Sequence, residues 1–252
     1  MDEQSNNRDP FYVGYLPMPV EHRRFVRTLV VLLALWILGV AMVIAMVMRN
    51  PGDAVWNTGN EQSWTGTFTM HPYPMLIPDN DLQNPLLVVS IGKHGAHDRL
   101  APFDRSVVKV RGWELHRDGR RLIELADDGD AITMISAVGE RSPPRGVSRA
   151  VVVEGEIVDG KCYLGAMKPG DGQGHRSCAV LCLRGHLPPM IATTQPDGTT
   201  GYHLLVIDGT TELSDEVLAM VARPVRIAGM VAHDYEGLSV LYAKSEDITP
   251  SE

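Results

Sequence analysis

Three cysteines, Cys162, Cys178 and Cys182, carry most of the chemistry that this sequence offers, and they lie within 21 positions of one another. Thiolates bind soft and borderline metal ions, form disulfides or act as nucleophiles. His175 precedes Cys178 by three residues, so an imidazole accompanies the thiols along the chain. Because the number of cysteines is odd, disulfide pairing alone would leave one thiol over.

The spacing of these residues predicts a four-ligand metal site. Residues 175–183 are expected to form a short helix, preceded by a glycine-rich turn and ended by a glycine. At about 100° per residue, His175, Cys178 and Cys182 fall within one sector of about 60° and face the same way. Cys162 ends the preceding strand and is expected to meet them there. The predicted ligands of a structural metal ion, for which zinc is the best fit, are Cys162, His175, Cys178 and Cys182.

A disulfide is the first alternative, because it is the usual state of cysteines in an oxidising compartment. Cys162 paired with Cys178 or with Cys182 would link the cysteine-bearing insertion to its barrel and leave one free thiol. Cys178 and Cys182 are poorer partners for each other, because thiols four residues apart on a helix point in parallel. In this interpretation the chain holds no metal cofactor.

Copper is the second alternative. Cys178, Cys182 and His186 follow one another at intervals of four residues, and Met190 comes four residues later. This spacing resembles the binuclear copper loop of cytochrome oxidase subunit II, and two thiolates, an imidazole and a thioether suit copper. In that family a longer β framework supplies a second histidine, so His71 or His203 would have to serve here. A thiol-redox role is a related alternative, with Cys178 near a helix N-terminus as the reactive thiolate.

One segment is apolar for long enough to cross a bilayer. Residues 28–48 contain no charge, and about 20 such residues span a hydrocarbon core of about 30 Å. Four arginines precede the segment, whereas no Lys or Arg occurs between Arg49 and Lys93, so the positive-inside rule places the N-terminus in the cytoplasm. The apolar run is longer than that of a signal peptide and lacks a small-x-small cleavage site. We therefore expect an uncleaved, single-pass anchor in the inner membrane of a bacterium, with the rest of the chain periplasmic or extracellular.

The charge balance and the missing motifs exclude several functions. The net charge is −8, which argues against a general nucleic-acid binder. The sequence contains no Walker loop, GxSxG, HExxH or CxxCH motif, so nucleotide hydrolysis, serine hydrolysis, zincin proteolysis and c-type haem attachment have no support. These observations favour a non-catalytic role.

Two segments of the exported part, residues 64–125 and 153–241, resemble each other. Each has a strand with a central glycine, an apolar strand, an alternating strand and, after a glycine turn, a last strand. Such a repeat predicts two similar units. Short strands of period 2 and a helix candidate at residues 214–222 indicate a small Greek-key barrel of the OB type, with a β-sandwich as the alternative.

The predicted fold is mainly β, with an N-terminal transmembrane helix followed by two tandem small OB-like β-barrel domains. Only the second unit has the cysteine-bearing insertion. The expected boundaries are a cytoplasmic tail at 1–27, the transmembrane helix at 28–48, the first OB-like domain without cysteines at 49–139, a linker at 140–149 and the second OB-like domain with the Cys/His insertion at 150–252.

The motifs of the second unit resemble a group of bacterial membrane-anchored exported proteins. That group has a CYL or CFL, an MKPG, an HxxCAxxC and a Pro-containing stretch in a small OB-like domain, and the resemblance covers roughly residues 150–245. It implies that the cysteines and His175 form one group, and it names no reaction. At the position of His186 the group usually has glycine, which weakens copper ligation by this histidine as a general function. The matching residues are Cys162-Tyr163-Leu164, Met167-Lys168-Pro169-Gly170, His175, Cys178-Ala179, Cys182 and Pro188-Pro189.

Together these features predict a membrane-anchored periplasmic accessory protein with a Cys/His site that supports a membrane or respiratory complex. Its expected partners are the bilayer, through residues 28–48, and the subunits of that complex. The alternatives are a copper-binding or thiol-redox protein that uses Cys178, Cys182 and His186, and a non-catalytic adaptor that binds a protein partner through an OB face.

Overall fold

The computed structural model describes residues 18–47, 54–137, 148–194, 200–235 and 237–251. The chain divides into two compact units, Met1–Asn50 and Pro51–Glu252. Most of the predicted cytoplasmic tail and most of the predicted linker at 140–149 lie outside the described residues, as does the last residue of the predicted span, Met48.

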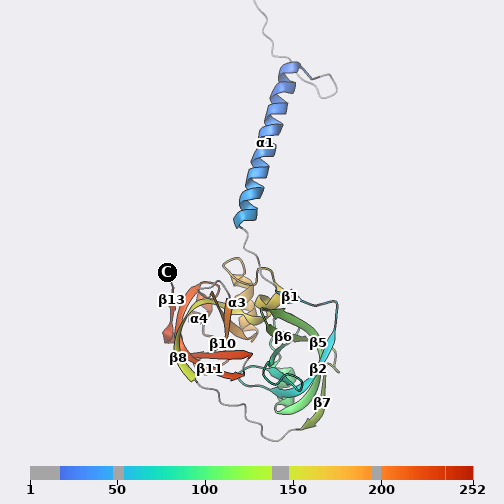
Figure 1. Cartoon of the computed structure of the whole chain (residues 1–252), viewed down its shortest axis with the longest axis vertical. Helices are drawn as coiled ribbons and strands as arrows, with labels where there is room; N and C mark the ends of the chain where they lie inside the picture. The colour runs from blue at the N-terminus through green and yellow to red at the C-terminus, as the bar shows by residue number, and fades with distance from the viewer. Residues whose placement is uncertain (1–17, 48–53, 138–147, 195–199, 236, 252) are drawn as a thin grey trace, which may run out of the picture. The chain divides into compact units, whose positions relative to one another are not determined.

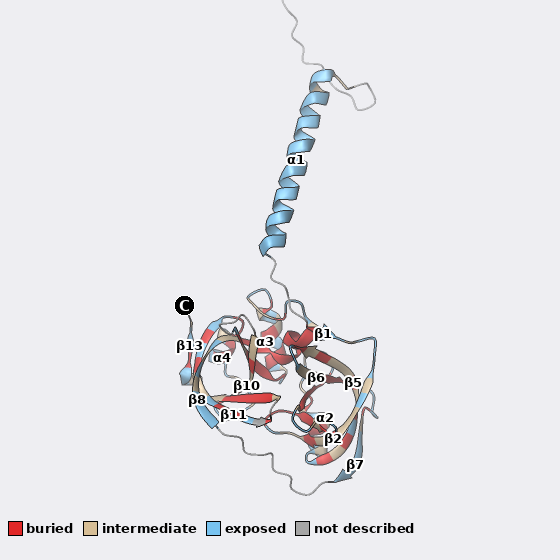
Figure 2. Cartoon of the chain, viewed as in Figure 1, coloured by how far each residue is buried: buried red, intermediate tan, exposed pale blue. Residues whose placement is uncertain are grey.

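The first unit contains one long helix, α1 (Val20–Val47), of 28 residues. Its apolar side chains are exposed on all sides, as the pale blue helix of Figure 2 shows. At about 1.5 Å per residue, a helix of this length can cross a bilayer. It starts eight residues before the predicted span because the helix continues through the arginine-rich segment. The unit therefore has the length and composition of an N-terminal anchor or signal helix.

The first barrel closes five strands in the order β2–β3–β4–β6–β5 and back to β2. All pairs are antiparallel except β4 with β6, which is parallel. Two short strands, β1 (Val55–Trp56) and β7 (Ile132–Ala137), pair with β5, and helix α2 (His97–Leu100) and a 3-10 turn (Ala101–Phe103) lie between β4 and β5. The barrel strands are β2 (Gln62–Thr69), β3 (Met75–Pro78), β4 (Leu86–Val89), β5 (Ser106–Arg117) and β6 (Arg120–Leu125).

The second barrel repeats this topology, with the order β8–β9–β10–β12–β11 and a parallel β10–β12 pair (Figure 1). Helix α4 (Asp215–Met220) lies between β10 and β11, within the helix candidate at residues 214–222. The hydroxyl of Ser214, the residue before this helix, accepts a hydrogen bond from the Val217 amide at 3.4 Å. A 3-10 turn (Ser245–Asp247) precedes β13 (Ile248–Pro250), which pairs with β11. The barrel strands are β8 (Ser148–Asp159), β9 (Pro189–Thr194), β10 (Thr200–Ile207), β11 (Pro224–Tyr235) and β12 (Leu238–Ala243). The fold prediction of a helix and two closed mixed β-barrels is confirmed.

A glycine near the middle of the first strand has the same role in both barrels. A Cβ atom at Gly66 would overlap the carbonyl oxygen of Ile77 on β3, and one at Gly155 would overlap the carbonyl oxygen of Ala192 on β9. Close approach of the neighbouring strand therefore requires glycine at these positions. This requirement explains the central glycine that the two segments share in sequence.

A shared apolar core lies between the two barrels of the second unit, and each barrel also has a core of its own. The buried side chains of the shared core come from strands of both barrels and from the insertion between β8 and β9, and Cys162 and Cys182 are among them. Buried residues accordingly continue from one barrel to the other in Figure 2. The buried members of this shared core include Tyr73, Leu87, Leu115, Leu122, Tyr163, Leu164, Leu204 and Val240.

A buried ion pair lies in the seam between the barrels. The ammonium of Lys161, directly after β8, contacts the carboxylate of Glu124 on β6, and the two side chains are 4% and 3% exposed. The same ammonium donates hydrogen bonds to the carbonyl oxygens of Ser90, at 3.0 Å, and Gly92, at 2.6 Å. The second barrel thus holds the loop that follows β4 of the first.

Substituting Lys161→Met removes the cation and leaves the Glu124 carboxylate buried without its partner. We expect a loss of about 3–5 kcal/mol in the free energy of unfolding, the usual effect of breaking a buried pair. Chemical unfolding of the full chain in detergent, followed by tryptophan fluorescence, measures it. The matched control is Lys244→Met, which removes the cation of an exposed ion pair and should change stability by less than about 0.5 kcal/mol. Equal effects of the two substitutions would contradict a structural role for the buried pair.

Candidate metal centre

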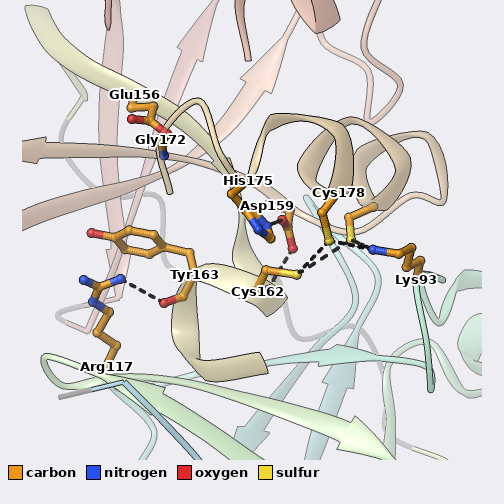
Figure 3. A network of polar contacts seen from close by, with 10 residues as sticks. Lys93, Arg117, Glu156, Asp159, Cys162, Tyr163, Gly172, His175 and Cys178 are labelled. Atoms are coloured by element: carbon orange, nitrogen blue, oxygen red, sulfur yellow. Dashed lines mark hydrogen bonds and ion pairs between the residues drawn. The ribbon is translucent and has the colours of Figure 1, made fainter. Parts of the chain in front are cut away.

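All three cysteines come from the insertion between β8 and β9. Cys162 opens a tight π-helical turn (Cys162–Ala166) just after β8, and the other two cysteines lie on helix α3 (Arg176–Arg184), close to the helix that the spacing predicted. The carboxylate of Asp159, the last residue of β8, accepts a hydrogen bond from the Cys162 amide at 2.8 Å. This bond fixes the start of the turn, so that Cys162 faces α3 (Figure 3).

The three sulfur atoms form one compact group. The Sγ atom of Cys162 lies 3.9 Å from that of Cys178 and 3.8 Å from that of Cys182. A disulfide requires roughly 2.05 Å, so neither sulfur is at bonding distance from Cys162, the disulfide alternative does not hold in this structure, and all three cysteines are free. Two sulfurs on a tetrahedral zinc ion, each at about 2.3 Å from the metal, are about 3.8 Å apart. The spacing of the sulfurs therefore fits joint coordination of one metal ion.

A lysine of the first barrel completes the surroundings of the thiols. The Lys93 ammonium donates a hydrogen bond to the sulfur of Cys178 at 2.6 Å and lies 3.6 Å from that of Cys182 (Figure 3). Its loop is held against the end of α3 by a hydrogen bond from the Gly95 amide to the Gly185 carbonyl at 2.6 Å. Lys93 was not predicted, since no sequence pattern pairs it with cysteines of the other barrel. Gly95 and Gly185, which allow the two segments to approach closely, are the local signal in the sequence.

The predicted ligand His175 lies beside Cys162 but contacts a carboxylate. Its Nε2 atom is 3.2 Å from an oxygen of Asp159, and the two side chains are 3% and 0% exposed. Ligand atoms of Asp159, Cys162 and His175 lie within 4.8 Å of one another, as do the three sulfurs, so two potential metal-binding groups share Cys162. Sequence reasoning missed Asp159, although its position three residues before Cys162 is typical of a side chain that caps a turn.

The contacts among the thiols and Lys93 shift the pKa values of Cys162 and Cys182 in opposite directions. The hydrogen-bond contact with Cys182, together with burial, raises the pKa of the Cys162 thiol far above its usual value. The same contact lowers the pKa of the Cys182 thiol, with a further contribution from Lys93. Hydrogen bonding to Cys178 raises the pKa of Lys93, which stays a cation. Cys182 therefore loses its proton before Cys162 does, and the lysine compensates the charge.

The alternative copper ligands do not gather in the same way. Among the described residues, His186 has no ligand atom within 4.8 Å of both the Cys178 and the Cys182 sulfur, although these two sulfurs lie that close to each other. His186 follows α3 with a φ of 64°, and its ring lies edge-on to that of His97, with 6.3 Å between the ring centroids. Met190 is buried in the shared core. The structure thus brings the three thiols and Lys93 together and leaves His186 outside.

Comparison of the chain with protein-family models, curated proteins and solved structures finds no match. The class of protein is therefore defined by its fold and its site. It has an N-terminal apolar helix, two closed β-barrels and a buried cysteine cluster with an adjacent Asp–His pair, and this cluster could hold a metal ion.

Three free thiols should be detectable in the full chain without reductant. When the protein is unfolded in denaturant with a chelator, Ellman's reagent should report three thiols per chain, because no sulfur pair is at bonding distance. The same measurement after prior reduction is the control and should give the same number. One thiol before reduction and three afterwards would show that two of the cysteines form a disulfide, and would contradict the prediction.

Proposed function

We propose that this chain is a membrane-anchored exported protein that binds one zinc ion through Cys162, Cys178 and Cys182. The observation that carries the proposal is the separation of 3.8–3.9 Å between the Cys162 sulfur and the other two sulfurs, which matches the edge of a zinc–thiolate tetrahedron. Two of the three cysteines are buried and Cys178 is half-buried, so the protein shields most of the cluster from solvent.

The charges at the site support a divalent ion. Three thiolates and one Zn²⁺ leave a net charge of minus one, which the Lys93 ammonium balances at 2.6 Å from Cys178. Without a metal, three ionised thiols in this apolar setting would repel one another, and only one lysine would oppose them. The cluster is thus close to neutral when a zinc ion is bound.

Asp159 and His175 act in this proposal as positioning residues. Asp159 accepts from the Cys162 amide and contacts His175, so it holds both the turn that carries one ligand and the residue before α3, which carries the other two. Carboxylates and histidines behind metal ligands commonly have this role. The predicted set of three cysteines and one histidine becomes a set of three cysteines with a supporting Asp–His pair.

A structural ion here would join the turn after β8 to α3 and, through Lys93, to the first barrel. It would therefore stabilise the seam between the barrels. Since the sequence has no hydrolase or nucleotide-binding motif, we take the protein to be a non-catalytic accessory of a membrane complex, anchored by α1.

The first test measures the metal content of the full chain purified in detergent. We expect one zinc ion per chain by elemental mass spectrometry. The affinity for zinc should fall at least tenfold in Cys162→Ser, Cys178→Ser and Cys182→Ser, because each variant loses one thiolate ligand. Asp159→Asn should retain the stoichiometry with an affinity lower by about 10–100-fold, the usual effect of a residue behind the ligands. His186→Ala is the control and should match the unchanged chain. Full zinc content in all three serine variants would contradict the proposal.

The second test concerns orientation. Because arginines cluster before the apolar segment at residues 28–48, within the first turns of α1, we expect the barrels outside the cytoplasm. A protease added to spheroplasts should degrade the barrels while a cytoplasmic marker protein stays intact. Recovery of the barrels in the culture medium would identify α1 as a cleaved signal sequence, and protease resistance until lysis would place the barrels inside the cell.

A further inference from the structure

A cavity of about 410 Å³ opens beside the sulfur cluster in the seam between the barrels. All three cysteines and Lys93 contribute to one part of its lining, and the rest is mostly apolar. Two of the four tryptophans in the chain, Trp56 and Trp113, line it. The lining also includes Ile91 and Met167 and the ion-paired Lys161 and Glu124.

The position of Trp56 is fixed by the same turn that carries Cys162. Strand β1, which ends at Trp56, lies directly against this turn. The approach is so close that a Cβ atom at Gly165 would come within 2.6 Å of the Val55 carbonyl oxygen. Gly165 also has a φ of 154°, which other residues rarely adopt. β1 pairs with β5, the strand that carries Trp113. The aromatic walls and the sulfur cluster are therefore parts of one rigid arrangement.

Three sulfur ligands leave the fourth tetrahedral position of a zinc ion open. His175 is grouped with Cys162 and Asp159 but not with Cys178 and Cys182, and its Nε2 atom contacts the Asp159 carboxylate. The cysteines line the cavity, so a fourth ligand can reach the metal from there. Volumes of about 300–1,000 Å³ are usual for small-molecule sites.

The charges in the cavity select the kind of ligand. Lys93 balances the metal and its three thiolates, and Lys161 and Glu124 balance each other. A charged ligand would add an uncompensated charge to an apolar cavity, which is unfavourable. Two tryptophans favour a flat aromatic ring.

We propose that the cavity binds an uncharged nitrogen heteroaromatic molecule of the imidazole or pyridine class. Its ring packs against Trp56 and Trp113, and its ring nitrogen takes the fourth position on the metal. This inference rests on the proposed zinc site and deepens it, because it makes the site a receptor for a small molecule.

The experiment uses the full chain in detergent, with cobalt(II) in place of zinc and 4-phenylimidazole as the probe, at about pH 8, where imidazoles are uncharged. We expect saturable changes in the visible cobalt bands and in tryptophan fluorescence. Trp113→Leu and Trp56→Leu should each weaken binding at least fivefold with unchanged cobalt content. Trp64→Leu is the matched control, because Trp64 does not line the cavity. Benzoate, of similar ring size but anionic, should bind at least tenfold more weakly.

The outcomes separate this inference from the zinc site. If the chain takes up no cobalt, the proposed function itself fails. If cobalt binds but 4-phenylimidazole at millimolar concentration changes neither the bands nor the fluorescence, the inference is overturned and the metal site stands. Binding of benzoate as tight as that of 4-phenylimidazole, or equal binding by all three tryptophan variants, would also overturn it.

Discussion

The buried ion pair between Lys161 and Glu124 is the interaction on which the site depends. Lys161 directly precedes Cys162, and its ammonium also binds the carbonyl oxygens of Ser90 and Gly92. One side chain thus aligns the turn that carries a thiol with the loop that carries Lys93. Because breaking a buried pair leaves an uncompensated charge, the structure has a strong energetic reason to keep the two barrels in this register.

The two barrels show how one fold can serve as scaffold and as site. Both close five strands in the same order, yet only the second has a long insertion between its first two strands. The insertion carries the thiols, and the first barrel contributes a lysine, a carboxylate and two aromatic walls. The thiols are therefore carried by one connection of a repeated barrel framework, and residues at the interface of the two barrels complete their surroundings.

Local sequence patterns predicted the helices and strands, but they did not predict the contacts between the two barrels. Hydrophobicity identified α1, the glycine-centred strands identified both barrels, and the periodicity of His175, Cys178 and Cys182 identified α3. The thiols were expected together, and they are. Lys93 and the cavity could not be predicted, because they depend on how two distant segments pack. His175 lies beside Cys162 as expected, but its contact with Asp159 was not predicted, because it depends on how the end of β8 packs against the residue before α3.

X-ray absorption at the zinc edge of the full chain, as purified from the membrane, tests the central claim most directly. It counts the sulfur and lighter ligands around the metal and measures their distances. The account predicts three sulfurs at about 2.3 Å and one nitrogen or oxygen ligand at about 2.0–2.1 Å. A zinc ion surrounded by nitrogen and oxygen alone, or a preparation with no metal at the cysteines, would contradict it.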